Sequence, residues 1–268
     1  MNSAHDGPTF SLHRGSVPLL VSLPHDGSVI PDAMAARMTE AARVAPDTDW
    51  HVARLYAFAR ELGASVLVPK YSRYVVDLNR PPDDISLYPG QNTTGLCPTV
   101  QFSGDSVYRD DQQPAPGEIA ARVDAYWRPY HAALSEELQR LRAQHGRVVL
   151  WDGHSIRGEC PFLFDGRLPD LNLGTAAGAS CSAALQLKLE VALASQRRYD
   201  FVVNGRFKGG YITRHYGDPD NGIDAVQLEI SQRIYMDETS YEYDEAKASK
   251  VRHVVRALLE AGPLEERL

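Results

Sequence analysis

The chain has 268 residues, of which 43% are hydrophobic, and a formal net charge of −7 at pH 7. That length and apolar content allow one large core, so we interpret residues 1–268 as a single α/β domain with a core from about 17 to 262. The acidic charge, without a cluster of lysine and arginine, argues against nucleic acid and anionic membranes as partners. The N-terminus lacks a signal peptide pattern and no stretch reaches 18 apolar residues, so we expect a cytoplasmic protein. An oligomeric state is not indicated.

The first third of the chain alternates predicted strands and helices. After a polar lead-in, residues 17–23 form an apolar run that predicts a buried strand, ended by Pro24. Residues 31–44 and a segment from Asp47 to Gly63 have the composition or spacing of helices. Two further strands are predicted at 64–71 and 74–78.

The remaining elements follow a βαβ order, which predicts mostly parallel strands in a mixed sheet with helices on both faces. A loop at 81–116, rich in Pro, Gly and Asn, is long enough to be functional. A long amphipathic helix follows at 117–145, with a bend expected near Pro129. The other predictions are a strand at 147–151, an irregular stretch at 155–180, a helix at 181–195, a strand at 201–204, a strand at 225–231 and a helix at about 241–261.

Two predicted strands each end in a histidine. His25 follows the strand at 17–23, and His154 follows the strand at 147–151 within the run Asp-Gly-His. Parallel strands that end at one edge of an α/β sheet deliver these side chains to the same rim, where such folds bind ligands. A metal ion is therefore a candidate occupant, although a lone histidine is also commonly a hydrogen-bonded structural residue.

A third, acidic ligand is needed, because catalytic zinc sites typically use three protein ligands. Asp26 is adjacent to His25, and one short loop does not readily direct both side chains to the same ion. We exclude Asp152 as a ligand because we expect its side chain to point to the opposite face of the strand. Asp47 and Asp49 remain, at the start of a predicted helix, where an aspartate can equally be a plain N-cap.

Two further features carry charge at unusual places. Glu229 lies in an apolar strand, where it is either an outward-facing or ion-paired residue or a general base beside a metal-activated water. The segment 204–217 combines four glycines with several cations, among them Arg214, but it lacks the pattern of a phosphate-binding loop.

Six motifs, in this order between about residues 17 and 238, resemble the N-formylglutamate amidohydrolase family. They are Ser22–Gly27, Asp47–Trp50, Arg73–Arg80, Leu150–Ile156, Asn204–Tyr211 and Gln227–Ser231. More remotely, the chain is similar to zinc carboxypeptidases and aspartoacylase-type deacylases, which implies a zinc-carboxypeptidase-like (phosphorylase/hydrolase-like) fold. Those relatives place the acidic ligand three residues after the first histidine, where this chain has Ser28. This spacing does not identify the acidic ligand of this chain, for which we choose Asp49, with Asp47 in reserve.

The resemblance implies hydrolysis of the small molecule N-formyl-L-glutamate to formate and L-glutamate, a step of histidine degradation. It implies zinc bound by His25, Asp49 and His154, although cobalt, manganese or iron would suit the same ligands. Glu229 would move the proton and Arg73 would stabilise the oxyanion. Asn79, Arg80 and Arg214 would bind the two substrate carboxylates.

Three alternatives remain at this stage. The chain could be a zinc deacylase of another N-acyl acidic amino acid, or a non-catalytic binder of acidic amino acids with a structural metal. A cysteine hydrolase using Cys97 or Cys160 is a third possibility, although the odd number of widely spaced cysteines fits unreactive thiols in a reducing compartment.

Overall fold

A computed structural model of the chain describes residues 7–87, 90 and 92–262. Within them, one sheet has the strand order β1-β3-β2-β4-β7-β5-β6. The strands are β1 Phe10–His13, β2 Leu19–Ser22, β3 Ser65–Pro69, β4 Val148–Ile156, β5 Leu171–Gly174, β6 Phe201–Val203 and β7 Ile223–Ser231. The central strands β3, β2, β4 and β7 are parallel, whereas β1 and β5 run antiparallel to β3 and β7. The predicted mixed, mostly parallel sheet is confirmed.

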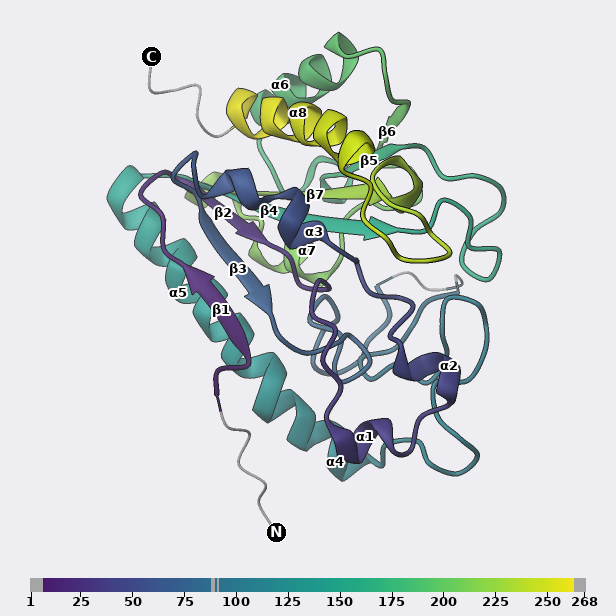
Figure 1. Cartoon of the computed structure of the whole chain (residues 1–268). Coiled ribbons are helices and arrows are strands. Elements are labelled where there is room, and N and C mark those ends of the chain that lie inside the picture. Colours follow the sequence, from purple (N-terminus) through teal and green to yellow (C-terminus); the bar gives the residue numbers. More distant parts are fainter. Residues whose placement is uncertain (1–6, 88–89, 91, 263–268) are drawn as a thin grey trace.

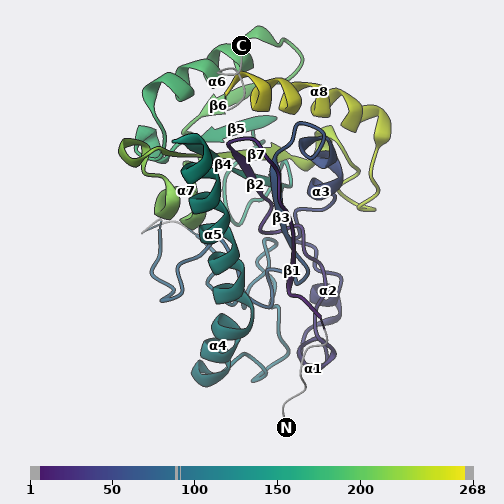
Figure 2. The ribbon, with the colours of Figure 1, turned by 90° about the vertical axis from the view of Figure 1, so that its left-hand side faces the viewer.

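Helices cover both faces of this sheet, as predicted (Figure 1). They are α1 Asp32–Ala35, α2 Glu40–Arg43, α3 Val52–Leu55, α4 Pro116–Arg122, α5 Arg128–His145, α6 Ala183–Ser195, α7 Tyr211–Tyr216 and α8 Glu245–Ala261. One face packs against α3, α6 and α8, and the other against α4, α5 and α7. Figure 2 shows α5 and α8 on these different sides of the strands. None of the described helices is long and apolar enough to span a membrane.

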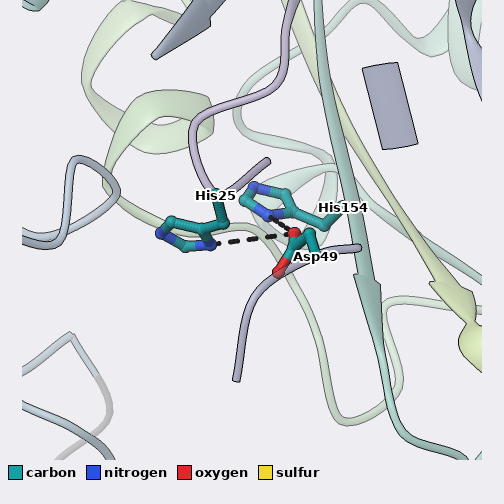
Figure 3. A group of neighbouring side chains, drawn as sticks. All are labelled: His25, Asp49 and His154. Atoms are coloured by element: carbon teal, nitrogen blue, oxygen red, sulfur yellow. Dashed lines mark hydrogen bonds and ion pairs between the residues drawn. The ribbon is translucent and has the colours of Figure 1, made fainter. Parts of the chain in front are cut away.

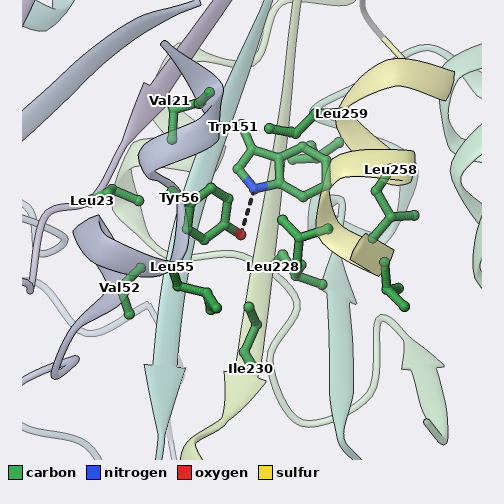
Figure 4. Packing of buried hydrophobic residues seen from close by; sticks show 14 of the residues in the cluster. Val21, Leu23, Val52, Leu55, Tyr56, Trp151, Leu228, Ile230, Leu258 and Leu259 are labelled. Atoms are coloured by element: carbon green, nitrogen blue, oxygen red, sulfur yellow. Dashed lines mark hydrogen bonds between the residues drawn. The ribbon is translucent and has the colours of Figure 1, made fainter. Parts of the chain in front are cut away.

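The core on the α8 side is built around Trp151 of β4, which is fully buried (Figure 4). Its indole Nε1 donates a hydrogen bond of 2.9 Å to the hydroxyl of Tyr56, so the polar atom of this large side chain is satisfied. Leu228 of β7 and Leu258 of α8 belong to the same cluster. This packing fixes the middle of β4, from which the candidate site extends.

Gly153 separates Asp152 from His154 because there is no room for a side chain at this position. A Cβ atom there would lie 2.7 Å from Leu23 Cδ2 and 3.2 Å from Tyr56 Cζ. The glycine lets these side chains pack onto the strand, while residues 152 and 154 both point to the opposite face.

Several predicted elements are wrong in extent or type. The helix predicted at 31–44 is divided into α1 and α2, because Thr39 caps the second by accepting a hydrogen bond from the Ala42 amide. The strand predicted at 74–78 is a turn, in which the Ser72 hydroxyl accepts a hydrogen bond from the amide of Tyr74. The helix predicted to begin at 47–49 is the short α3, and the Asp26 carboxylate accepts a hydrogen bond from the Ala53 amide in its first turn.

The long helix predicted at 117–145 is present, but it contains a π-helical turn at Val123–Trp127 just before Pro129. A proline lacks an amide proton, which disturbs the regular α-helical ladder at the preceding turn. Elements that the sequence interpretation missed are β1 in the polar lead-in, β5 in the stretch 155–180 and α7 in the glycine-rich segment.

Candidate metal centre and active site

His25, Asp49 and His154 meet at one rim of the sheet (Figure 3). All three are buried, and one ligand atom from each lies within 4.8 Å of the others. His25 follows β2 and His154 lies in β4, and these parallel strands are neighbours. The prediction that two strand ends bring the histidines together is confirmed, with 4.8 Å between their ring centroids.

Asp49 reaches this rim through contacts with both histidine segments. Its amide donates to the carbonyl of His25 at 3.0 Å, and its Oδ2 accepts from the amide of Ser155 at 3.0 Å. Oδ2 also lies 2.9 Å from Nδ1 of His154. Burial tends to raise the pKa of this carboxyl, but the hydrogen bond from His154 and the nearby positive charges bring it below the ordinary value.

The outer nitrogen of each histidine faces a second carboxylate. Nε2 of His25 lies 2.7 Å from Asp77 Oδ1, and Nε2 of His154 lies 3.2 Å from Asp152 Oδ2. Metal-binding histidines almost always donate their other ring N–H in this way, which fixes the tautomer and orients the ring. Asp152, which the sequence analysis excluded as a metal ligand, thus lies on the same face of β4 as His154 and contacts its ring.

The charge balance of the site also fits a cation. Four buried carboxylates surround the histidines, those of Asp49, Asp77, Asp152 and Glu229. The main positive charge that compensates them is the guanidinium of Arg73. Although burial alone would lower the pKa of His154, Asp152 and Asp49 raise it well above its ordinary value. Carboxylates that attract a proton this strongly also attract a divalent ion, so the donor set suits a metal.

Glu229 lies beside this cluster and not on the surface. It is the register partner of His154 across β4 and β7, and it lines the same cleft. The side-chain amide of Gln227 donates to its Oε2 at 3.3 Å. Burial in this site raises the pKa of Glu229 to about 8, against the lowering effect of His154. The carboxyl is therefore a group whose ionisation depends on a nearby positive charge.

Arg73 is held between two of the acids. Its Nη2 donates to Asp77 Oδ2 at 2.6 Å, and its Nη1 lies 3.9 Å from Asp49 Oδ1. The guanidinium also stacks over the ring of Phe102, at 4.8 Å from the ring centroid. Arg73 thus lines the cleft as a fixed positive charge next to the candidate metal ligands.

Asn79 lies at the base of the cleft, where protein groups engage its side chain. Its Nδ2 lies 3.1 Å from Asp152 Oδ2 and 2.9 Å from His154 Nε2, and its Oδ1 accepts from the amide of Ile212 at 2.7 Å. A Cβ atom at Gly210 would lie 2.5 Å from Asn79 Nδ2, so the absence of a side chain at this position allows Asn79 to approach the backbone closely. The side-chain nitrogen of Asn79 thus donates to Asp152, which contacts His154, and its oxygen holds the first turn of α7.

The predicted substrate arginines separate into two groups. Arg80 lines the cleft and its Nε donates to the carbonyl of Thr94 at 2.9 Å. Arg214 lies on the exposed side of α7, where its Nε donates to Gly209, and it is not part of the cleft wall. The cation that the glycine-rich segment brings to the cleft is Arg206, which the sequence interpretation missed.

The cleft as a whole encloses about 660 Å³ of space, part of it open to solvent. Besides the charged residues its wall contains Asn92, Thr94, Phe102, Ile156, Leu163 and Phe207. Residues 92–102 belong to the loop predicted at 81–116, so that loop forms one wall. Tyr88, Pro89 and Gln91 of the loop lie outside the described residues.

The three cysteines take no part in this cleft. Cys97, Cys160 and Cys181 are buried free thiols. Burial raises the pKa of Cys97 to about 11 and those of the other two to about 12, whereas a nucleophilic thiol needs a lowered pKa. The cysteine-hydrolase alternative therefore lacks a reactive thiol in the described part of the chain.

Asp47, the reserve ligand, points away from the histidines. Its Oδ2 accepts from the hydroxyl of Tyr74 at 2.6 Å and from the amide of Phe102 at 2.8 Å. Because the Phe102 ring lies against Arg73, Asp47 anchors the loop residue that supports this cation.

Replacing Asp47 with alanine should lower the free energy of unfolding of the metal-free protein by about 2–4 kcal/mol, because two buried donors lose their acceptor. Urea denaturation measures this change. Tyr74→Phe, which removes one of the two donors, is the matched control and should cost less. Loss of bound metal at unchanged stability would instead return Asp47 to the list of ligands.

Comparison with known proteins identifies the family to which the chain belongs. Residues 17–236 match the family model described as N-formylglutamate amidohydrolase. The chain is 53% identical to the N-formylglutamate deformylase of Pseudomonas aeruginosa PAO1 and 51% identical to that of Pseudomonas putida, over 94% of each chain. Among solved structures, an N-formylglutamate amidohydrolase from Ralstonia eutropha JMP134 superposes with a TM-score of 0.80 at 26% identity, covering 94% of this chain and 96% of that one.

Proposed function

Because the chain belongs to the N-formylglutamate amidohydrolase family, we propose that it hydrolyses N-formyl-L-glutamate to formate and L-glutamate with the help of a divalent metal ion. The observation that carries the metal is the buried group of His25, Asp49 and His154, with each outer histidine nitrogen on a carboxylate. We further place this activity in histidine degradation in the cytoplasm, which is consistent with three free thiols.

His25 Nδ1, His154 Nδ1 and a carboxylate oxygen of Asp49 are the proposed ligand atoms, because they face one another while the Nε2 atoms are engaged by Asp77 and Asp152. When bound, such an ion polarises a carbonyl oxygen and lowers the pKa of water to about 7. The mixed nitrogen and oxygen donors suit zinc, and they would also accept cobalt, manganese or iron.

Glu229 is the proposed proton carrier. It takes a proton from the attacking water as the new C–O bond forms, and it gives a proton to the amino nitrogen as the C–N bond of the formamide breaks. Its burial beside the ligands, on the strand adjacent to His154, supports this role. A carboxylate is required for the first transfer, and a neighbouring cation lowers the raised pKa of this residue toward the ionised form.

Arg73 is the proposed oxyanion stabiliser. As water adds to the formyl carbon, negative charge develops on the former carbonyl oxygen and a fixed guanidinium nearby stabilises it. Asp77 and the Phe102 ring hold the Arg73 guanidinium in place before substrate arrives, so little reorganisation is needed. Arg80, which lines the same cleft, is the proposed partner of the substrate α-carboxylate.

The test is formate release from N-formyl-L-glutamate by purified protein before chelation, after chelation and after zinc is restored. We expect the activity to be lost with the metal and to return with it, with the protein folded throughout by circular dichroism. Full turnover by demonstrably metal-free protein would remove the metal from the proposal.

The same assay separates the alternatives. A deacylase of another N-acyl acidic amino acid would release more product from N-acetyl-L-glutamate or N-formyl-L-aspartate than from N-formyl-L-glutamate. A non-catalytic binder would bind L-glutamate but release formate in no metal state.

A further inference from the structure

We infer that Arg206 binds the side-chain carboxylate of the substrate and so makes the enzyme selective for an acidic amino acid. This inference rests on the proposed function and deepens it. The observations that carry it are the place of Arg206 in the cleft wall, its connection to Arg80 through a single loop segment, and the apolar side chains around it.

Arg206 enters the cleft from the segment that follows β6. The side chain is half-buried, and its Nη2 donates to the carbonyl of Leu163 at 3.0 Å and to that of Asn92 at 3.3 Å. Its guanidinium lies 5.7 Å from the ring centroid of Phe207. Three separate segments of the chain thus meet at this guanidinium, and the contacts hold its direction.

Arg80 and Arg206 are connected through residues 92–94. Arg206 donates to the carbonyl of Asn92 and Arg80 donates to that of Thr94. Carbonyls two residues apart are separated by at most about 7 Å in an extended chain. The two guanidinium groups therefore border the same short stretch of the cleft wall, and with hydrogen bonds of 2.9 and 3.3 Å their donor nitrogens lie at most about 13 Å apart.

Glutamate has matching dimensions. Its two carboxylate carbons are separated by four single bonds, which span roughly 5 Å when extended, and each guanidinium N–O hydrogen bond adds about 2.8 Å. One molecule can therefore contact both arginines at once. A substrate without the side-chain carboxylate can contact only one.

The position of the metal ligands decides which carboxylate each arginine binds. The α-carboxylate and the formylated nitrogen share one carbon atom, so the α-carboxylate must stay close to the reacting group. Arg80 follows Asn79, whose amide contacts His154, and so it is the partner on the metal side. Arg206 contacts the outer wall at Leu163 and Asn92, where the side-chain carboxylate extends.

The surroundings of Arg206 make its charge necessary. Ile156, Leu163 and Phe207 line this part of the cleft with apolar surface. A carboxylate that leaves water for such a wall is destabilised unless a charged partner compensates it. Without Arg206 the same wall would accept a neutral side chain about as well as before.

The test compares N-formyl-L-glutamate with N-formyl-L-glutamine, which has the same shape without the charge. In Arg206→Met, kcat/KM for the glutamate substrate should fall by about 10²-fold or more, while that for the glutamine substrate should stay within about threefold. Lys208→Met is the matched control, since it removes an exposed cation two residues away that is not in the cleft wall, and both substrates should keep their rates.

An equal loss of kcat/KM for both substrates would show that Arg206 supports the loops and does not bind the substrate carboxylate. That result would overturn this inference and leave the proposed function intact. If the wild type itself failed to release formate from N-formyl-L-glutamate, the proposed function would fall, and the inference with it. If Arg206→Met does not fold, Arg206→Gln keeps donors for the wall carbonyls without the charge. The same change in substrate preference is then expected, and an unchanged preference would overturn the inference.

Discussion

We expect replacement of Glu229 with glutamine to lower kcat for N-formyl-L-glutamate by about 10³-fold, and the variant to keep the proposed metal ion. Glutamine preserves the shape of the side chain, but its amide cannot take a proton from water or return one to the leaving nitrogen. Glu229 lies outside the group formed by His25, Asp49 and His154, so metal binding should survive. The measurement is steady-state formate release together with the metal content of the purified variant.

Glu242→Gln is the matched control for this variant, because it neutralises an exposed carboxylate that does not line the cleft. It should leave kcat unchanged. A Glu229→Gln variant with wild-type turnover would exclude Glu229 as the proton carrier. A variant that loses both turnover and metal would make Glu229 a ligand instead.

The pair of histidines could be predicted from the sequence because the signal is local. One apolar strand stops just before His25 and another continues to His154, so each predicts a histidine at a strand end. Neighbouring parallel strands bring such ends together. Glu229 could also be predicted from local sequence, because a carboxylate is rare in an apolar strand unless another group pairs with it. Asp152 was within reach too, because residues two apart on a strand share a face, which places it beside His154.

The choice between Asp47 and Asp49 could not be made from local sequence. They are separated by one residue, and their roles depend on partners far along the chain: Phe102 for the first and Ser155 for the second. Both partners arrive only when the loop at 81–116 and the end of β4 are in place. The resemblance to remote relatives did not decide between them either, because the position of the acidic ligand in those proteins corresponds to Ser28 in this chain.

Arg214, which the sequence predicted as a substrate-binding residue, lies outside the described cleft wall for a similar reason. Helix α7 begins at Tyr211 after Gly210, without a side-chain cap, so nothing local marks its start. Once the segment is helical, Arg214 lies on its exposed side, and Arg206 is left in the irregular part that follows β6. A cation count identified the segment, whereas only the fold identifies the residue that reaches the cleft.

If zinc is the proposed metal, we expect replacement of Asp49 with asparagine to weaken its binding by at least about 10²-fold and Asp47→Asn to leave it unchanged. Asparagine in place of Asp49 can still accept the hydrogen bond from the Ser155 amide, so the fold of the rim is kept and only the negative ligand is lost. Loss of an outer-shell partner already costs 10 to 100-fold in affinity, and loss of a ligand should cost more. Competition with a chelator of known affinity measures both variants.

The comparison is sharp because the two aspartates are both buried and differ mainly in direction. Asp49 points to Nδ1 of His154, and Asp47 points to Tyr74 and Phe102. If Asp47→Asn lost the metal and Asp49→Asn kept it, the loop that carries both residues would have to adopt a different conformation in the metal-bound protein. Equal retention by both variants would mean that the histidines bind the ion with a different acid, and Asp77 and Asp152, already in contact with their rings, would be the candidates.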